Sequence, residues 1–215
     1  MNKFVALLGA LVLAGGGYYL GNANKPEPTV IKVPEAPKAA FSSSGTEEVK
    51  TAGAVDVTVR NLKTPTSGEV IIVKDGESIQ DAVLAASPGA VIKVMPGTYK
   101  ETVYIDKDNI TLSGVIEGGK YPVLEGEGVR NDAVLYSGNG VTIENLYITH
   151  YKGNGIMGQA GNNFIIRNNF VIDTGVYGIF PQLGKNGLVS HNVISGIEDA
   201  AIYVGMSENI DVVYN

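Results

Sequence analysis

The sequence predicts an all-β fold, namely a parallel β-helix with a period of about 22–24 residues per coil and a short N-terminal capping helix. Three observations predict it. Asparagine recurs at one place of a repeat, a small residue followed by isoleucine recurs with the same period, and no helical 3.6-residue periodicity accompanies them. In a chain rich in Val, Ile and Gly, self-similarity at such a period is typical of the stacked turns of a solenoid.

Asparagine marks one position of the repeat. It stands at or directly after a short apolar strand pattern, at intervals of 24, 23 and 23 residues, at Asn145, Asn169, Asn192 and Asn215. Successive coils stack about 4.8 Å apart, so residues one period apart lie above each other. Their amides can then form a hydrogen-bonded ladder, and asparagine also tolerates the left-handed backbone of a tight bend. We therefore expect the asparagines to stabilise the fold rather than to bind a ligand.

The second marker assigns side chains to the interior and to the surface. Ile156, Ile179 and Ile202, with Val134 one coil earlier, are expected to point inward. Because side chains alternate along a strand, the residues that follow them point outward. The outward column is Leu135, Met157, Phe180 and Tyr203, flanked by the columns Ser137, Gln159, Gln182, Gly205 and Asn131, Gly153, Val176, Asp199.

These columns predict a candidate binding face, which consists of Met157, Gln159, Phe180, Gln182, Asp199 and Tyr203. A contiguous exposed apolar surface often marks a binding site. Aromatic rings next to amides, a phenol and a carboxylate suit the ring faces and hydroxyl groups of sugars. The alternative is that a loop or a C-terminal segment covers the column, which would make it a packing surface.

Residues 1–67 are expected to lie outside the folded domain. Residues 1–23 combine Lys3, an apolar run from Phe4 and small residues up to Ala23, which predicts a secretory signal or, as the alternative, an uncleaved membrane anchor. Either one predicts an extracytoplasmic location: secreted, periplasmic or in the cell envelope. Residues 24–67 are rich in proline and serine and predict a largely disordered spacer, although 55–59 alternates like a strand.

The β-helix is expected to occupy residues 68–215. Its first strand is predicted at 70–73, and a short helix at 79–86 follows, opened by Glu77 or Ser78. Such a helix covers the core and the strand edges of a first coil. The sequence stops in mid-coil at the ladder position Asn215 with no cap after it, so we expect either further chain or a covering partner there.

Composition argues against several classes of function. The net charge of −6 disfavours nucleic acid as a partner, since phosphate binding needs clustered Lys and Arg. The chain has no cysteine, which excludes disulfides and thiolate metal sites. Calcium would need outward carboxylates in a dense cluster, and Asp173, Glu198 and Asp199 are scattered. No cofactor is therefore expected, and calcium between outward carboxylates is the alternative.

Five segments resemble known β-helix proteins. The segments 78–83, 96–103 and 109–114 resemble the opening of right-handed parallel β-helix proteins of the pectate-lyase-like and NosD-like superfamily. Farther on, 177–181 and 199–205 resemble a bacterial group of secreted β-helix repeat proteins that are described by their fold alone. The resemblance implies a right-handed helix and specifies function only weakly.

Lyases and epimerases of this superfamily abstract a proton beside a uronate carboxylate, which requires a base and a cation. The groups available here are His150, Lys152, Arg167, Tyr177, His191 and Tyr203. The two histidines occupy different places in the repeat, and each is expected to be solvated or hydrogen-bonded. Where alginate epimerases carry Asp-Pro-His, this chain has Phe-Pro-Gln at 180–182.

The leading hypothesis is thus a secreted or envelope protein that binds polysaccharide through its exposed strand face. One alternative is an enzyme of the lyase or epimerase type on uronate polymers, with catalytic residues unassigned. The other is a purely structural envelope module. A membrane is expected as a partner only through residues 1–23, if they are not cleaved.

Overall fold

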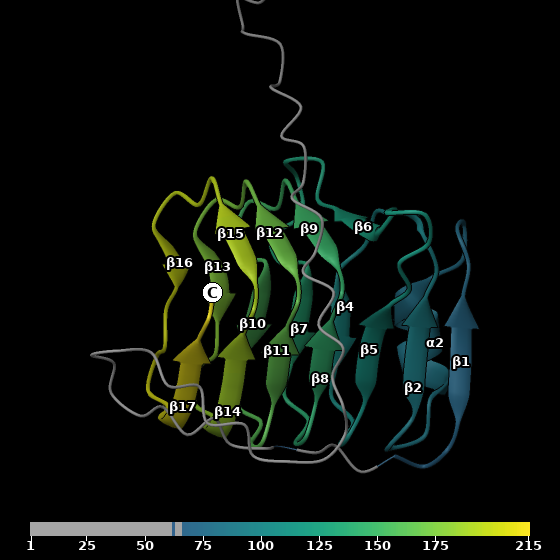
Figure 1. Cartoon of the computed structure of the whole chain (residues 1–215), viewed down its shortest axis with the longest axis horizontal. Coiled ribbons are helices and arrows are strands. Elements are labelled where there is room, and N and C mark those ends of the chain that lie inside the picture. The colour runs from purple at the N-terminus through teal and green to yellow at the C-terminus, as the bar shows by residue number, and fades with distance from the viewer. Residues whose placement is uncertain (1–61, 63–65) are drawn as a thin grey trace, which may run out of the picture. The chain divides into compact units, whose positions relative to one another are not determined.

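The computed structural model describes Leu62 and residues 66–215, and these residues include a parallel β-solenoid of about six turns. All pairings between the named strands are parallel, and strands of successive turns lie side by side (Figure 1). The fold class predicted from the repeat is confirmed. The predicted signal or anchor at 1–23 and the strand pattern at 55–59 lie outside the described residues.

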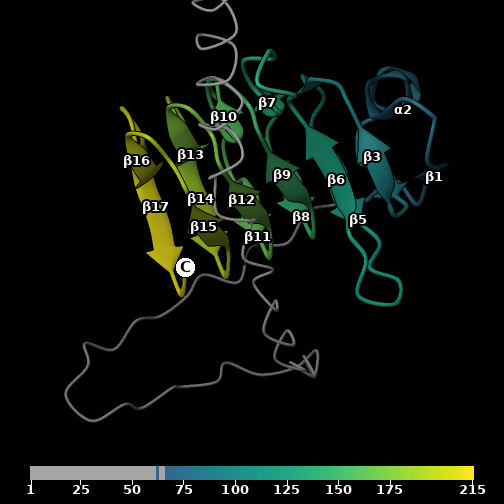
Figure 2. The ribbon, with the colours of Figure 1, turned by 90° about the horizontal axis from the view of Figure 1, so that it is seen from above.

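The strands form three sheets, seen from a second direction in Figure 2, which we call sheets A, B and C. Sheet A contains β1 (Val70–Val73), β2 (Val91–Val94), β5 (Thr111–Gly114), β8 (Thr142–Glu144), β11 (Ile165–Arg167), β14 (Lys185–Ser190) and β17 (Glu208–Val213). Sheet B contains β3 (Gly97–Tyr99), β6 (Pro122–Glu125), β9 (Tyr147–Thr149), β12 (Phe170–Ile172) and β15 (Val193–Ser195). Sheet C contains β4 (Val103–Ile105), β7 (Val134–Tyr136), β10 (Ile156–Gly158), β13 (Tyr177–Phe180) and β16 (Ala200–Ile202).

The regular period holds in the later coils and fails in the earlier ones. From β8 onward, partners in sheet A lie 23 residues apart, as for Glu144 and Arg167. Between β5 and β8 the separation is 31 residues, as for Ser113 and Glu144. The additional residues lie in the connections at 115–121 and 126–133, which are longer than the corresponding connections of the later coils. The strands on either side keep their parallel register. The predicted period therefore describes only part of the domain.

The predicted capping helix is present as α2 (Ile79–Ala85). Ser78 is its N-cap, and the Ser78 Oγ accepts a hydrogen bond from Asp81 N at 3.1 Å. The carboxylate of Glu101 accepts from the backbone N–H groups of Ile79 and Gln80, at 2.8 and 2.9 Å. The free N–H groups of the first turn are thus satisfied, and their partial positive charge meets a carboxylate.

One lysine side chain binds the free carbonyl groups at the C-terminal end of α2. The Lys107 Nζ donates to the backbone carbonyls of Val83, Leu84 and Ala86, at 3.0, 2.6 and 2.7 Å. Buried Ile79 and Val83 face the core, and α2 contacts β1, β2 and β4. The helix therefore takes the place of a coil and shields the first turn, as predicted.

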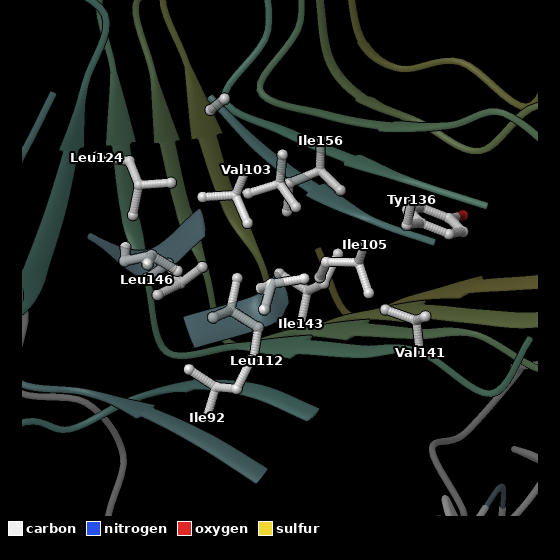
Figure 3. Packing of buried hydrophobic residues seen from close by; sticks show 14 of the residues in the cluster. Ile92, Val103, Ile105, Leu112, Leu124, Tyr136, Val141, Ile143, Leu146 and Ile156 are labelled. Atoms are coloured by element: carbon white, nitrogen blue, oxygen red, sulfur yellow. The ribbon is translucent and has the colours of Figure 1, made fainter. Parts of the chain in front are cut away.

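The core is a continuous stack of aliphatic side chains inside the coils. Ile92, Leu112 and Ile143 follow one another on the inner side of sheet A, and each is fully buried. Figure 3 shows them facing the side chains of Val103 and Ile105 from sheet C. Each coil buries its apolar side chains against the coil above and below, and this shared burial stabilises the stack.

The asparagine ladder is present at three of its four predicted positions. The Asn169 Nδ2 donates to Asn192 Oδ1 at 3.0 Å, and the Asn192 Nδ2 donates to Asn215 Oδ1 at 2.8 Å. Each rung also accepts a backbone N–H from the coil before it: Leu146 N donates to Asn169 Oδ1 at 3.1 Å. The residue aligned with Asn169 in the coil before it is therefore Leu146, which takes part only through its backbone N–H. The prediction was wrong for Asn145.

Asn145 belongs to the neighbouring column, which makes the bend between sheets A and B. Its φ is 60°, and the residues at the same place in later coils, Asn168, His191 and Tyr214, have φ of 57°, 55° and 56°. Asparagine adopts this left-handed conformation at low cost, whereas tyrosine does so rarely. The interval from Asn145 to Asn169 is longer than the two equal intervals after it, and this was the signal that Asn145 lies one position out of register.

The bend between sheets C and A carries a second ladder, which the sequence analysis missed. The Asn162 Nδ2 donates to Asn139 Oδ1 at 3.1 Å, and the Asn139 Nδ2 donates to Asp108 Oδ1 at 3.2 Å. Asn139 and Asn162 keep the 23-residue interval, but the first rung is an aspartate, 31 residues before Asn139. Two asparagines at one interval are too short a series to reveal a ladder.

Candidate binding face on sheet C

The outer face of sheet C carries the predicted column of apolar and aromatic side chains. Leu135, Met157 and Phe180 are register partners on β7, β10 and β13. Tyr203 directly follows Ile202, the register partner of Ile179, so it extends the column by one coil. Their inward neighbours Val134, Ile156 and Ile179 are fully buried, and Ile202 is half-buried in the last coil. The predicted inward and outward assignment therefore holds along the whole column.

The structure lengthens the column toward the N-terminus. Tyr104 on β4 is the register partner of Leu135 and is 39% exposed. Its hydroxyl lies 2.8 Å from the Ser137 hydroxyl, which belongs to the predicted flanking column. Periodicity does not predict Tyr104, because the coil that separates it from Leu135 is longer than the repeat.

Three rings meet at the C-terminal part of this column. The ring centroids of Phe180 and Tyr203 lie 5.1 Å apart, and Tyr177 lies 4.8 Å from Phe180 and 5.0 Å from Tyr203. Strict alternation from Ile179 would place Tyr177 inside the coil. Tyr177 begins β13 at a bend, where alternation fails, and its ring lies outside with the other two. We call Met157, Tyr177, Phe180 and Tyr203 the sheet C column.

A carboxylate borders the three rings. The Asp199 carboxylate lies close to the Tyr177 hydroxyl. Loss of solvent around the ring, followed by the Asp199 charge and its interaction with the hydroxyl, raises the pKa of Tyr177. The phenol therefore stays protonated at neutral pH, and the pair offers one anionic acceptor at the edge of an aromatic surface.

The predicted amide column runs along the other side of the rings. Gln159 is exposed and Gln182 is half-buried, and the Ala160 N–H donates to the Gln182 carbonyl at 3.2 Å, which sets the two coils in register. Gln182 forms a bridge with Gly205 in the next coil. The structure thus brings all six predicted face residues onto one side of sheet C: Met157, Gln159, Phe180, Gln182, Asp199 and Tyr203.

The surface beyond the rings is also apolar. Tyr203 is 46% exposed, and Leu183, Val204 and Met206, which follow β13 and β16, are exposed as well. The Leu183 N–H donates to the Gly205 carbonyl at 3.1 Å, so these two connections lie against each other. Apolar groups so close together form a patch of the kind that marks binding or packing surfaces.

Of the residues considered as candidate bases, Tyr177 and Tyr203 come together in the sheet C column, whereas the two histidines and Arg167 lie elsewhere. The His150 Nδ1 lies 3.0 Å from Glu125, whereas the His191 ring lies against Tyr214 with centroids 5.3 Å apart. Arg167 pairs with Glu144 at 2.8 Å on sheet A. Lys152 is exposed before β10, and Tyr177 holds its proton for the reasons given above. The predicted separation of the two histidines is correct.

Among the residues that the structure describes, no three His, Asp or Glu side chains gather closely enough to hold a metal ion. Within the same residues, α2 is too short and too polar to cross a bilayer, and no other helix does so either.

Comparison with known proteins identifies the family. A family model described as "Right handed beta helix region" matches residues 48–215, which is more than half of the chain. The protein therefore belongs to the right-handed β-helix family. A search of curated proteins finds no match.

Proposed function

We propose that the protein is an extracytoplasmic β-helix protein that binds polysaccharide through the sheet C column. The observation that carries this proposal is the group of three partly exposed rings beside Asp199, with Gln159 and Gln182 on the other side. Ring faces of Tyr and Phe supply large contact areas at low entropic cost, and the polar groups beside them can bind hydroxyls.

The charges of this face favour a neutral glycan over a uronate polymer. Asp199 borders the rings, and Asp132 accepts from the Asn154 Nδ2 at 2.7 Å in the coils before it. A uronate carboxylate would meet these like charges, which costs binding free energy in proportion to how closely they approach. Neutral hydroxyl groups, by contrast, can donate to both carboxylates.

The same geometry supports binding over proton abstraction. A lyase or epimerase needs a base next to a cation that neutralises the substrate carboxylate. Tyr177 keeps its proton beside Asp199, and Arg167 is paired on a different sheet. We therefore give binding precedence over the lyase-type and purely structural alternatives.

Export of the protein is part of the proposal and rests on the sequence of residues 1–23 alone. Cell fractionation with an antibody to residues 68–215 tests it. Recovery outside the cytoplasm supports export, and recovery in the cytoplasmic fraction contradicts it. The mass of the recovered protein distinguishes a cleaved signal from a retained anchor.

Affinity electrophoresis tests the binding proposal. The full chain is run through native gels that contain a neutral glucan, xylan or galactomannan, with pectate and alginate gels beside them. We expect retardation in at least one neutral gel and less in the uronate gels. Absorbance of unsaturated products, read after incubation with pectate, alginate and a glycosaminoglycan, is expected to stay at baseline. Retardation in none of the gels would contradict binding, and an increase in absorbance would instead establish a lyase.

A further inference from the structure

A second row of aromatic side chains lies on the outer face of sheet B. Tyr147 on β9 and Phe170 on β12 are register partners, and their rings stack with centroids 5.9 Å apart. Tyr121, directly before β6, sets its ring edge-on to Phe170 at 5.2 Å. Val193 on β15 is the next register partner and is exposed. We call Tyr121, Tyr147, Phe170 and Val193 the sheet B strip.

Two carboxylates and a histidine border the sheet B strip where its strands end. The His150 Nδ1 lies 3.0 Å from both carboxylate oxygens of Glu125, and its Nε2 lies 4.0 Å from Asp173 Oδ2. The Asp173 side chain is 57% exposed, against 19% for Glu125. Partial burial and then the charges of Asp173 and Glu125 raise the pKa of Tyr147. Both carboxylates are therefore close enough to the Tyr147 hydroxyl to influence its charge.

Two basic side chains of the neighbouring connections are bound to another carboxylate, whereas Lys120, directly before Tyr121, and Lys152, after β9, are exposed. Lys100, after β3, and Arg130, before β7, both lie 2.7 Å from Glu127. The open carboxylate beside the rings is Asp173, whose contact with His150 is longer than a hydrogen bond. The strand-end edge of the sheet B strip therefore carries an open carboxylate, with Lys120 at the opposite edge, and complementary charge on a ligand at the strand ends would be positive.

We propose that the sheet B strip binds a polysaccharide that carries free ammonium groups, namely a polymer of de-N-acetylated amino sugars. Aromatic faces attract cations, and a carboxylate beside them strengthens the attraction. The strip spans the four strands β6, β9, β12 and β15, about 14 Å at the usual strand spacing, which suits an extended chain. The exposed side chains of His150 and Ser195 offer hydrogen bonds to its hydroxyl groups.

This site differs from the proposed neutral-glycan face in position and in ligand charge. The sheet C column and the sheet B strip are built on different strands of the same coils. Either one can therefore fail without the other. Variants of the full chain at one face serve as matched controls for the other.

Isothermal titration of the full chain with a glucosamine hexamer, at low ionic strength, tests the proposal. Asp173→Asn removes the open charge and keeps a residue suited to the left-handed backbone found there, with φ of 54°. We expect about tenfold weaker binding for this variant, as for the loss of one close cationic contact. Asp106→Asn is the matched control, because Asp106 is exposed and belongs to neither the sheet C column nor the sheet B strip, and we expect it to bind the hexamer as the unchanged protein does.

Four outcomes would overturn the proposal. They are no detectable binding of the hexamer, unchanged affinity in Asp173→Asn, equal affinity for the N-acetylated hexamer, and an equal loss in Asp106→Asn. Spermidine provides a further arm: if it displaces the hexamer at equal concentration, the occupant is a small polyamine and the polymer assignment is wrong. Circular dichroism melts of both variants establish that they are folded.

Discussion

The asparagine ladder and the sheet C column repeat with the same 23-residue period in the later coils, yet their surroundings are opposite. Asn169 and Asn192 are buried, and each amide is occupied by neighbouring coils and backbone. The rings of Phe180 and Tyr203 contact each other and stay open to solvent on one side. Repetition thus determines which residues are aligned between coils. Burial and hydrogen bonding then distinguish a column that stabilises the fold from a column that remains accessible to a ligand.

Replacing a rung of the ladder is expected to have the largest effect on stability. Asn192→Ala removes the acceptor of the Asn169 N and Nδ2 groups and the donor to the Ile166 carbonyl. Unpaired polar groups would remain buried, so we expect a loss of about 3 kcal/mol in the free energy of unfolding. Urea denaturation followed by circular dichroism measures it.

The control for this variant is an asparagine of the surface. Asn131 is exposed, and Asn131→Ala is expected to change the free energy of unfolding by less than about 0.5 kcal/mol. Polysaccharide binding by folded Asn192→Ala should equal that of the unchanged protein. Equal stability losses in the two variants would remove the distinction between the ladder and an ordinary surface amide.

The buried tyrosines make the free energy of unfolding depend on pH in the alkaline range. Burial, with the charges of Asp75, Glu77 and Glu101, raises the pKa of Tyr99 to about 12, and burial also raises the pKa of Tyr136. An unfolded tyrosine loses its proton near pH 10, so above that pH the folded state binds more protons than the unfolded state. Stability is therefore fully present below pH 10 and falls as pH rises further.

For each such tyrosine the expected loss is about 1.4 kcal/mol per pH unit between pH 10 and its folded-state pKa. Urea denaturation at pH 8, 9, 10 and 11 measures it. A free energy of unfolding that is constant up to pH 11 would show that these hydroxyls are not protected by burial.

The smallest effect is expected at the ion pair on the outer face of sheet A. The Arg167 guanidinium lies 2.8 Å from Glu144, and its side chain is 47% exposed. Solvent screens such a pair, so Arg167→Ala should cost less than about 1 kcal/mol, and less still in high salt. Thermal melts in low and high salt measure this, and a loss as large as that of Asn192→Ala would mean that surface pairs stabilise the coils as much as the ladder does.

The sequence predicted the features that depend on regular repetition. Ile156, Ile179 and Ile202 established the inward and outward assignment, and this placed Met157, Phe180 and Tyr203 correctly on one face. The capping helix was also predictable, because Ser78 and the apolar face formed by Ile79 and Val83 are local signals. These features follow from alternation and capping, which require no knowledge of loop lengths.

Features that depend on unequal coil lengths were missed. Tyr104 and Leu135 are neighbours across a coil that is longer than the repeat, and Tyr121 reaches Phe170 from a connection without a repeat. The Glu125 contact of His150 also joins a strand end to a bend in the next coil. Sequence periodicity cannot place such residues, since loop geometry rather than the repeat brings them together.

The binding role of the sheet C column can be tested most directly with a double variant and a matched control. Phe180→Ala/Tyr203→Ala removes two rings from sheet C, and Tyr147→Ala/Phe170→Ala removes two rings of the same kind from sheet B. Dissociation constants for the neutral polysaccharide that retards the protein most are measured for both. We expect the sheet C variant to bind at least about tenfold more weakly, as for the loss of two central contacts, and the sheet B variant to bind normally. Unchanged binding by the folded sheet C variant, or an equal loss in both variants, would contradict a binding role for the sheet C column.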